Sequence, residues 1–129
     1  MGVLPRVYIC DDNPRMRQLI AARLAGRADI IGSGGTAEDA VAAASEFGPD
    51  VLVLDFRTAV SSLPETIAAI KEQSAGTTVV VHTGVPRYLI EDQVSAAGGI
   101  YSPKNEPEHL AELVRAVTPL DREAASPGS

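Results

Sequence analysis

Short runs of aliphatic residues alternate along the chain with longer segments in which apolar residues recur every three or four positions. A short aliphatic run between helical segments is typical of a buried strand in a parallel sheet. Among these runs, Val-Leu-Val-Leu at positions 51–54 gives the strongest strand prediction. The predicted strands cover residues 7–10, 28–31, 51–54, 78–81 and 99–102.

Each predicted strand is followed by a segment with the periodicity of an amphipathic helix. In the first of these helices Asn13 is the expected N-cap, Pro14 takes the first helical position, and Gly26 ends the helix. Later helices are expected after the cap Thr36, from about Pro64, over 86–97, and from about Glu106. The residues expected on inward faces include Met16, Leu19, Ile20, Leu24, Ala40, Val41, Ile67, Ile70, Leu89, Ile90, Val94, Leu110 and Val114.

Five consecutive strand–helix units with short connections predict an α/β fold. We expect a doubly wound, five-stranded parallel sheet with helices on both faces, formed by residues 1–117. Residues 118–129 contain two prolines and several small residues, and are expected to be a flexible tail or the stub of a linker.

Composition narrows the function classes. A chain of 129 residues is expected to be one domain. Its net charge of −6 argues against electrostatic binding of nucleic acid or of an anionic membrane. No apolar run approaches the roughly 20 residues of a membrane span, and no signal-peptide pattern is seen. A single cysteine, Cys10, suggests a reducing cytoplasm.

Acidic residues follow two of the predicted strands. Asp11 and Asp12 come directly after the first strand, and Asp55 comes directly after the third. If the two strands are neighbours in one parallel sheet, their carboxyl ends bring the three acids together. Like charges at one point repel unless a cation joins them, so a hard divalent ion such as Mg²⁺ is the expected partner.

Two further polar residues are expected at the same edge of the sheet. Thr83 falls at the end of the fourth strand and Lys104 just after the fifth. Carboxylates, a metal ion, a hydroxyl group and an ammonium group together suit the binding of a phosphoryl group. A carboxylate can also be the nucleophile that forms an aspartyl phosphate, and the central position of Asp55 favours it for that role.

Four short motifs at these strand ends carry a family resemblance. Cys10-Asp11-Asp12-Asn13, Leu52-Val53-Leu54-Asp55, Val81-His82-Thr83-Gly84 and Tyr101-Ser102-Pro103-Lys104 occur in that order. Over about residues 5–117 the chain resembles the receiver domain of two-component response regulators, of the CheY-like superfamily. The resemblance implies a flavodoxin-like sheet with strand order 2-1-3-4-5.

The resemblance also implies a function. Asp55 would be the phosphoacceptor of a sensor histidine kinase in a Mg²⁺-dependent step, so the chain would be a kinase substrate rather than an enzyme. Asp11, Asp12 and Asp55 would bind the metal with the backbone carbonyl of Arg57. Thr83 and Lys104 would contact the phosphoryl group, and Tyr101 would be the switch aromatic. A phosphorylation-linked homodimer is a further expectation, while the kinase, the signal and the output are not named by the sequence.

The chain departs from the family pattern in three places. Residues 56–64 replace the usual Met-Pro and glycine turn after the acceptor, Asn105 follows the lysine where many relatives have proline, and Gly98-Gly99 precedes the last strand. The loop departure supports an alternative, a pseudo-receiver that docks proteins without being phosphorylated.

Other interpretations stay open. The segment 32–37 fits G-x-G-x-x-A and, with Asp55 at a suitable distance, is an alternative dinucleotide-binding turn, although it follows the second strand rather than the first. Asp11 and Asp12 also fit a purely capping role as acids at a helix N-terminus, and Asp55 fits a structural ion pair with Lys104. Thr83, Tyr101 and His82 also fit ordinary strand residues.

Overall fold

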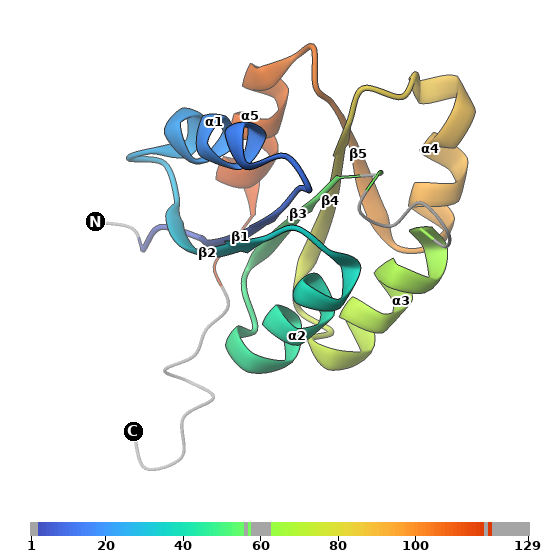
Figure 1. Ribbon diagram of the computed structural model, residues 1–129, viewed down its shortest axis with the longest axis horizontal. Helices are drawn as coiled ribbons and strands as arrows, with labels where there is room; N and C mark the ends of the chain where they lie inside the picture. The colour runs from blue at the N-terminus through green and yellow to red at the C-terminus, as the bar shows by residue number, and fades with distance from the viewer. Residues whose placement is uncertain (1–2, 56, 58–62, 118, 120–129) are drawn as a thin grey trace.

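Among the described residues, five parallel strands form a central sheet and five helices cover it (Figure 1). The computed structural model describes residues 3–55, 57, 63–117 and 119. The strands are β1 (Arg6–Cys10), β2 (Asp29–Gly34), β3 (Val51–Leu54), β4 (Thr78–Thr83) and β5 (Gly99–Pro103). The helices are α1 (Pro14–Leu24), α2 (Ala37–Phe47), α3 (Leu63–Gln73), α4 (Arg87–Ala96) and α5 (Pro107–Ala116).

The strand order is β2-β1-β3-β4-β5, and every neighbouring pair is parallel. The predicted doubly wound sheet and its order are therefore confirmed. Cys10 pairs with Leu54 across β1 and β3, so these two strands end side by side. Consequently the residues that follow them, Asp11 and Asp55, leave the sheet at the same edge.

The sheet has a hydrophobic core on each face. One core joins alternate strand residues to α2, α3 and α4, and the other joins the intervening strand residues to α1 and α5. Figure 1 shows the same division, with α1 and α5 together on one side of the sheet. Because β1, β3 and β4 are buried on both faces, their sequences are nearly continuous apolar runs.

Some predicted boundaries were wrong. β2 continues to Gly34 instead of ending at residue 31, because its main chain pairs with β1 as far as Cys10. β4 continues through Thr83 by pairing with β5, which makes Thr83 its last residue. α1 ends at Leu24 with Ala25 as its C-cap, and Gly26 follows with a left-handed φ of 78°, so Gly26 ends the helix as predicted.

Two residues predicted to face inward do not. Leu19 is 41% exposed and Leu89 is 55% exposed. Each helix contacts the sheet along a narrow stripe, Ile20 and Leu24 on α1 and Ile90 and Val94 on α4. Leu19 and Leu89 are adjacent in sequence to these stripe residues and therefore lie on the neighbouring flank of the helix.

Gly98 and Gly99, at the entry to β5, are needed for backbone conformation and close packing. Gly98 ends the α4 connection with a left-handed φ of 95°, which strains any residue with a side chain. A Cβ atom on Gly99 would lie 3.1 Å from Val94 Cγ1 and 3.3 Å from Ile67 Cδ1. The pair thus lets β5 approach the helices closely.

Two sequence predictions fall mainly outside the described residues: the loop at 56–62, apart from Arg57, and the tail at 118–129, apart from residue 119. Within the described residues, every helix is too short or too polar to cross a lipid bilayer.

Candidate functional site

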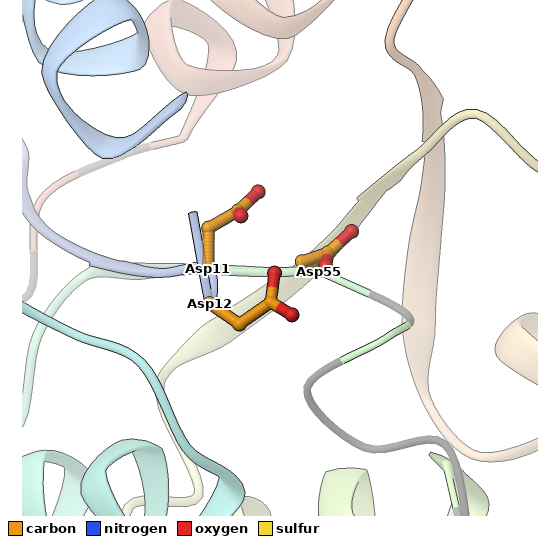
Figure 2. Close-up of side chains that lie close together, drawn as sticks. All are labelled: Asp11, Asp12 and Asp55. Carbon is orange, nitrogen blue, oxygen red and sulfur yellow. The ribbon is translucent and has the colours of Figure 1, made fainter. Parts of the chain in front are cut away.

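Three carboxylates meet at the carboxyl edge of the sheet, as predicted. Figure 2 shows Asp11 and Asp12 leaving the end of β1 next to Asp55 at the end of β3. One oxygen from each carboxylate lies within 4.8 Å of one from each of the others. Asp11 and Asp55 are 1% and 3% exposed, whereas Asp12 is exposed to solvent. The site therefore has two buried acids and one acid at its mouth.

Lys104 brings a positive charge to the buried acids. Its Nζ donates to Asp11 Oδ2 and to Asp55 Oδ1, each at 3.0 Å. Its backbone N–H donates to the carbonyl of Thr83 at 2.8 Å, which fixes the main chain just after β5. Burial lowers the pKa of Lys104, but the hydrogen bonds to Asp55 and Asp11 outweigh burial, and the net pKa is raised. Lys104 is thus held in its charged form.

Asp55 combines burial with an incomplete set of partners. Burial is the main cause that raises its pKa, Lys104 opposes the rise, and the charges of Asp11 and Asp12 add to it. Within the described part of the chain, its buried Oδ2 atom has no hydrogen-bond partner. A buried carboxylate oxygen in that state costs free energy unless a ligand, an ion or water satisfies it.

The residues present fit a hard divalent cation. The donor set contains only oxygen, two of the three carboxylates are buried, and Asp55 Oδ2 has no hydrogen-bond partner among the described residues. Asp11, Asp12 and Asp55 could hold such an ion. Arg57, predicted to offer its backbone carbonyl, lines the same cleft.

The cleft has a volume of about 570 Å³, and part of its lining is apolar. This apolar part consists of Met16 on α1, Leu89 on α4, and Val85 and Pro86 between β4 and α4. Met16 also packs against the core beside α1 and α5, as its helical spacing predicted, whereas Leu89 is exposed, because helical spacing alone does not decide which flank of a helix meets the core. The full lining is Asp11, Asp12, Asn13, Met16, Asp55, Arg57, Thr83, Gly84, Val85, Pro86, Leu89 and Lys104.

Thr83 and Tyr101 are connected through Val85. The Val85 backbone N–H donates to Thr83 Oγ1 at 3.1 Å. The carbonyl of Val85 accepts from the Tyr101 hydroxyl at 2.5 Å. The guanidinium of Arg87 lies over the Tyr101 ring, 4.7 Å from its centroid. Thr83 lines the cleft, and the buried Tyr101 contacts the connection between β4 and α4 through Val85.

His82 lies beside the site but not in it. Its Nδ1 is 3.2 Å from the hydroxyl of Ser102, and its side chain is 1% exposed. Burial, and less strongly the charge of Lys104, lowers its pKa to about 4. A neutral, buried histidine is consistent with the structural interpretation.

The glycine-rich turn does not fit a dinucleotide site. Asp39 Oδ2 accepts the backbone N–H groups of Gly35 and Thr36, at 3.0 and 3.3 Å. In a dinucleotide-binding turn, such N–H groups bind the pyrophosphate. Here the Asp39 carboxylate takes the place that a pyrophosphate would have, and its negative charge would repel a phosphate.

Comparisons with known proteins agree with this architecture. The signal receiver domain of NarL from Mycobacterium tuberculosis superposes with a TM-score of 0.78 at 22% sequence identity, covering 86% of this chain and 93% of that one. The response regulator domain of Thermotoga maritima CheB superposes with a TM-score of 0.79 at 19% identity, covering 89% and 96%.

The fold is that of a response regulator receiver domain. A CheY-like receiver domain from Methanospirillum hungatei also superposes on the chain, with a TM-score of 0.74 and 20% identity over 88% of this chain and 92% of that one. In the receiver fold, the cleft described above lies outside the carboxyl ends of β1, β3 and β4, where ligands gather in doubly wound sheets.

Sequence comparison adds a local match. The chain matches no protein-family model. A protein-glutamate methylesterase/protein-glutamine glutaminase from Agrobacterium fabrum is 42% identical over 57 residues. The match covers 43% of this receiver-fold chain and 16% of that protein, so the activity in the relative's name is not extended to this chain.

Proposed function

We propose that the chain is a phosphoacceptor switch in two-component signalling, with Asp55 as the acceptor. The observation that carries the proposal is the meeting of Asp11, Asp12 and Asp55 beside Lys104 at the carboxyl edge of the sheet. The likeness to receiver domains supports the same function. The proposed phosphodonor is a sensor histidine kinase and the proposed cofactor is Mg²⁺.

The reaction would be a transfer of one phosphoryl group to a carboxylate. An Asp55 oxygen forms a bond to phosphorus while the bond between phosphorus and the donor's histidine nitrogen breaks. The electron pair of the broken bond goes to that nitrogen. If the other ring nitrogen carries a proton, the histidine leaves as a neutral imidazole. The chain takes up the phosphoryl group and releases no product of its own, so we propose that it is a substrate rather than an enzyme.

The residues around Asp55 have separate tasks in this proposal. Lys104 already holds Oδ1 and would balance the charge of the phosphoryl oxygens. Thr83 accepts a hydrogen bond from Val85, which leaves its own O–H to donate to a phosphoryl oxygen. When bound, Mg²⁺ would supply a positive charge that both the acids and the phosphoryl oxygens share. Arg57 would add its carbonyl to the metal ligands.

The switch would pass from Thr83 to Tyr101 through Val85. If Thr83 turned toward a phosphoryl group, Val85 N–H would lose its acceptor, and the Val85 carbonyl that holds Tyr101 would be released to shift. The surface formed by α4 and β5 would then repack. We propose this surface for a phosphorylation-linked contact with a second copy or an output protein.

Intact mass spectrometry after incubation with a small phosphodonor tests the proposal. The unaltered chain should gain the mass of one phosphoryl group with Mg²⁺ and should gain little with EDTA. Asp55→Asn should gain none, while the control Asp29→Asn, which changes an exposed acid on β2, should label normally. If the unaltered chain neither binds Mg²⁺ nor labels, the pseudo-receiver alternative is correct. If Asp55→Asn labels, another residue is the acceptor.

A further inference from the structure

The backbone of Asp11 is held from two sides. Its N–H donates to the carbonyl of Gly34, the last residue of β2, at 3.0 Å. Its carbonyl accepts a hydrogen bond from Arg17 Nη1 at 2.6 Å. Its carboxylate is also fixed, because Oδ1 accepts the Asn13 N–H at 2.9 Å and Oδ2 accepts from Lys104. Arg17, a residue with no role in the proposed function, therefore supplies one of four contacts that orient the acid.

The glycine-rich turn makes room for that contact. A Cβ atom on Gly35 would lie 3.3 Å from Arg17 Nη1, 3.8 Å from the Asp11 carbonyl oxygen and 3.8 Å from Asp12 Cα. Those distances place the Gly35 backbone directly against the segment that carries the two acids. A side chain at this position would crowd the guanidinium as it reaches the carbonyl.

The neighbouring glycine is still more constrained. A Cβ atom on Gly34 would overlap the Tyr8 hydroxyl and would lie 2.7 Å from Asp39 Cβ. Asp39 in turn closes the turn through the N–H groups of Gly35 and Thr36. The hydrogen bond from Gly35 is the main cause that lowers the pKa of Asp39, and the charge of Arg17 contributes to the same direction. Asp39 therefore fixes the backbone of Gly35 and Thr36 and places one negative charge near Arg17.

We propose that Arg17 is a positioning residue for the acid pair Asp11-Asp12, and that the bend from the end of β2 into α2, at residues 34–36, makes room for it. Arg17 acts through the Asp11 carbonyl rather than by touching a bound ion. A hydrogen bond from a charged guanidinium is stronger than one between neutral groups, and it fixes the main chain from which both carboxylates project. The inference rests on the proposed Mg²⁺ site.

A positioning role and a purely electrostatic role of Arg17 predict opposite changes in Mg²⁺ affinity when Arg17 is replaced. If Arg17 acted only as a nearby positive charge, its loss would strengthen the binding of a cation at the acids. If it positions them, its loss must weaken that binding. Residues that orient metal ligands typically contribute about tenfold or more to metal affinity.

The experiment is an NMR titration of the ¹⁵N-labelled chain with MgCl₂, at constant ionic strength. Arg17→Met keeps the length and the apolar stem of the side chain but removes the donor. It should raise the Mg²⁺ dissociation constant about tenfold, and should shift the amide signals of Asp11 and Asp12 in the metal-free protein. The control is Arg15→Met, which removes an exposed charge from the same helix and should change the dissociation constant less than twofold.

Gly35→Ala is a second, independent variant. Its methyl group crowds Arg17 Nη1, so it should weaken Mg²⁺ binding in the unaltered background and add little once Arg17 is replaced by Met. It also keeps the inference testable if Arg17→Met does not fold.

The outcomes separate the inference from the proposed function. If the unaltered chain binds Mg²⁺, but Arg17→Met binds it equally or more tightly, the inference is wrong and the proposed function stands. The same conclusion follows if Gly35→Ala has the same effect with and without Arg17. If the unaltered chain does not bind Mg²⁺, both are wrong.

Discussion

At the scale of the residue, the buried acids determine the chemistry that this protein can perform. Asp11 and Asp55 are nearly inaccessible to solvent, and Lys104 is a cation that contacts both. Burial of two carboxylates is costly unless they are paired or bind an ion. This cost makes the site responsive to any added cation, because the cation relieves a repulsion that already exists in the folded chain.

Lys104→Ala tests the separate roles of the lysine and the metal. Without Mg²⁺, the free energy of unfolding of the variant should be about 2 kcal/mol lower, because two buried carboxylates lose their counter-ion. The variant should therefore unfold at a lower urea concentration. With Mg²⁺ it should recover much of this stability and still bind the ion, while phosphoryl uptake is impaired. Urea unfolding in EDTA and in Mg²⁺ measures both effects.

A suitable control for this prediction is Lys71→Ala, since Lys71 Nζ donates to the Thr77 carbonyl, away from the acids. Its stability should not depend on Mg²⁺ more than that of the unaltered chain. If Lys104→Ala abolished Mg²⁺ binding, the assigned roles of Lys104 and the acids would be wrong.

His82 predicts a pH dependence of stability. Its pKa is about 4 in the folded protein and near 6.5 when unfolded, so between these values the unfolded chain binds the extra proton. Its contribution is therefore complete above pH 6.5 and is lost as the pH falls toward 4. Each pKa unit corresponds to about 1.4 kcal/mol, so His82 alone should lower the free energy of unfolding by about 3 kcal/mol between pH 6.5 and pH 4.

Urea unfolding at several pH values measures how the free energy of unfolding changes with pH. His82→Gln should remove most of the histidine contribution, whereas His109→Gln on α5 leaves His82 in place and should retain it. An unchanged slope in His82→Gln would mean that other groups cause the acid sensitivity.

At the scale of the element, α2 shows how a sequence pattern specifies a helix start and also supports the site. Thr36 Oγ1 accepts the Asp39 N–H at 3.0 Å, and Asp39 accepts the Thr36 N–H in return. This reciprocal capping box satisfies N–H groups that the helix itself cannot. The same Asp39 oxygen also accepts the N–H of Gly35, the residue packed against Arg17, so the helix cap fixes the backbone next to the site.

Thr36→Ala should destabilise the protein by about 1 kcal/mol, since the helix loses its N-cap acceptor. Thr36→Ser keeps the hydroxyl at this exposed position and should stay close to the unaltered chain. Chemical denaturation followed by circular dichroism measures both variants. Equal stabilities of the two variants would show that the cap contributes little.

Sequence patterns predicted the elements themselves well, but not all their ends. The order of strands and helices follows from local periodicity, and all ten elements were expected. The end of β2 was wrong because Gly32, Ser33 and Gly34 resemble a loop by composition, yet the adjacent strand β1 supplies their hydrogen-bond partners. Strand pairing is a tertiary interaction, and residue propensity does not encode it.

At the scale of the whole molecule, the acidic site should couple metal binding to folding. Three carboxylates repel one another in the folded chain and separate when it unfolds, so an ion that joins them favours the folded state. At a free Mg²⁺ concentration one hundred times the dissociation constant, the stabilisation should be about 2.7 kcal/mol.

Thermal unfolding in MgCl₂, and in NaCl of equal ionic strength, measures this stabilisation. Tm should rise with Mg²⁺ and return when EDTA is added. Asp12→Asn should reduce the response, whereas Asp29→Asn, remote from the site on β2, should keep it. The same Tm in both salts would exclude a metal site at these acids.

The sequence by itself determined the class of the fold and the main polar members of the site. Buried parallel strands require apolar runs, and a polar residue directly after such a run must leave the sheet at its carboxyl edge. Asp11, Asp12, Asp55, Thr83 and Lys104 could be assigned in this way because their positions depend only on strand order and direction.

Only the tertiary structure decided what surrounds these residues. Arg17 contacts the Asp11 backbone because α1 returns across the end of β1. Position 35, just after β2, lies against this contact, and a side chain there would crowd Arg17. Leu89 stands at the cleft because α4 turns only one flank toward the sheet. Such contacts join residues from different elements, and their geometry depends on how the elements pack, which no local pattern in the chain specifies.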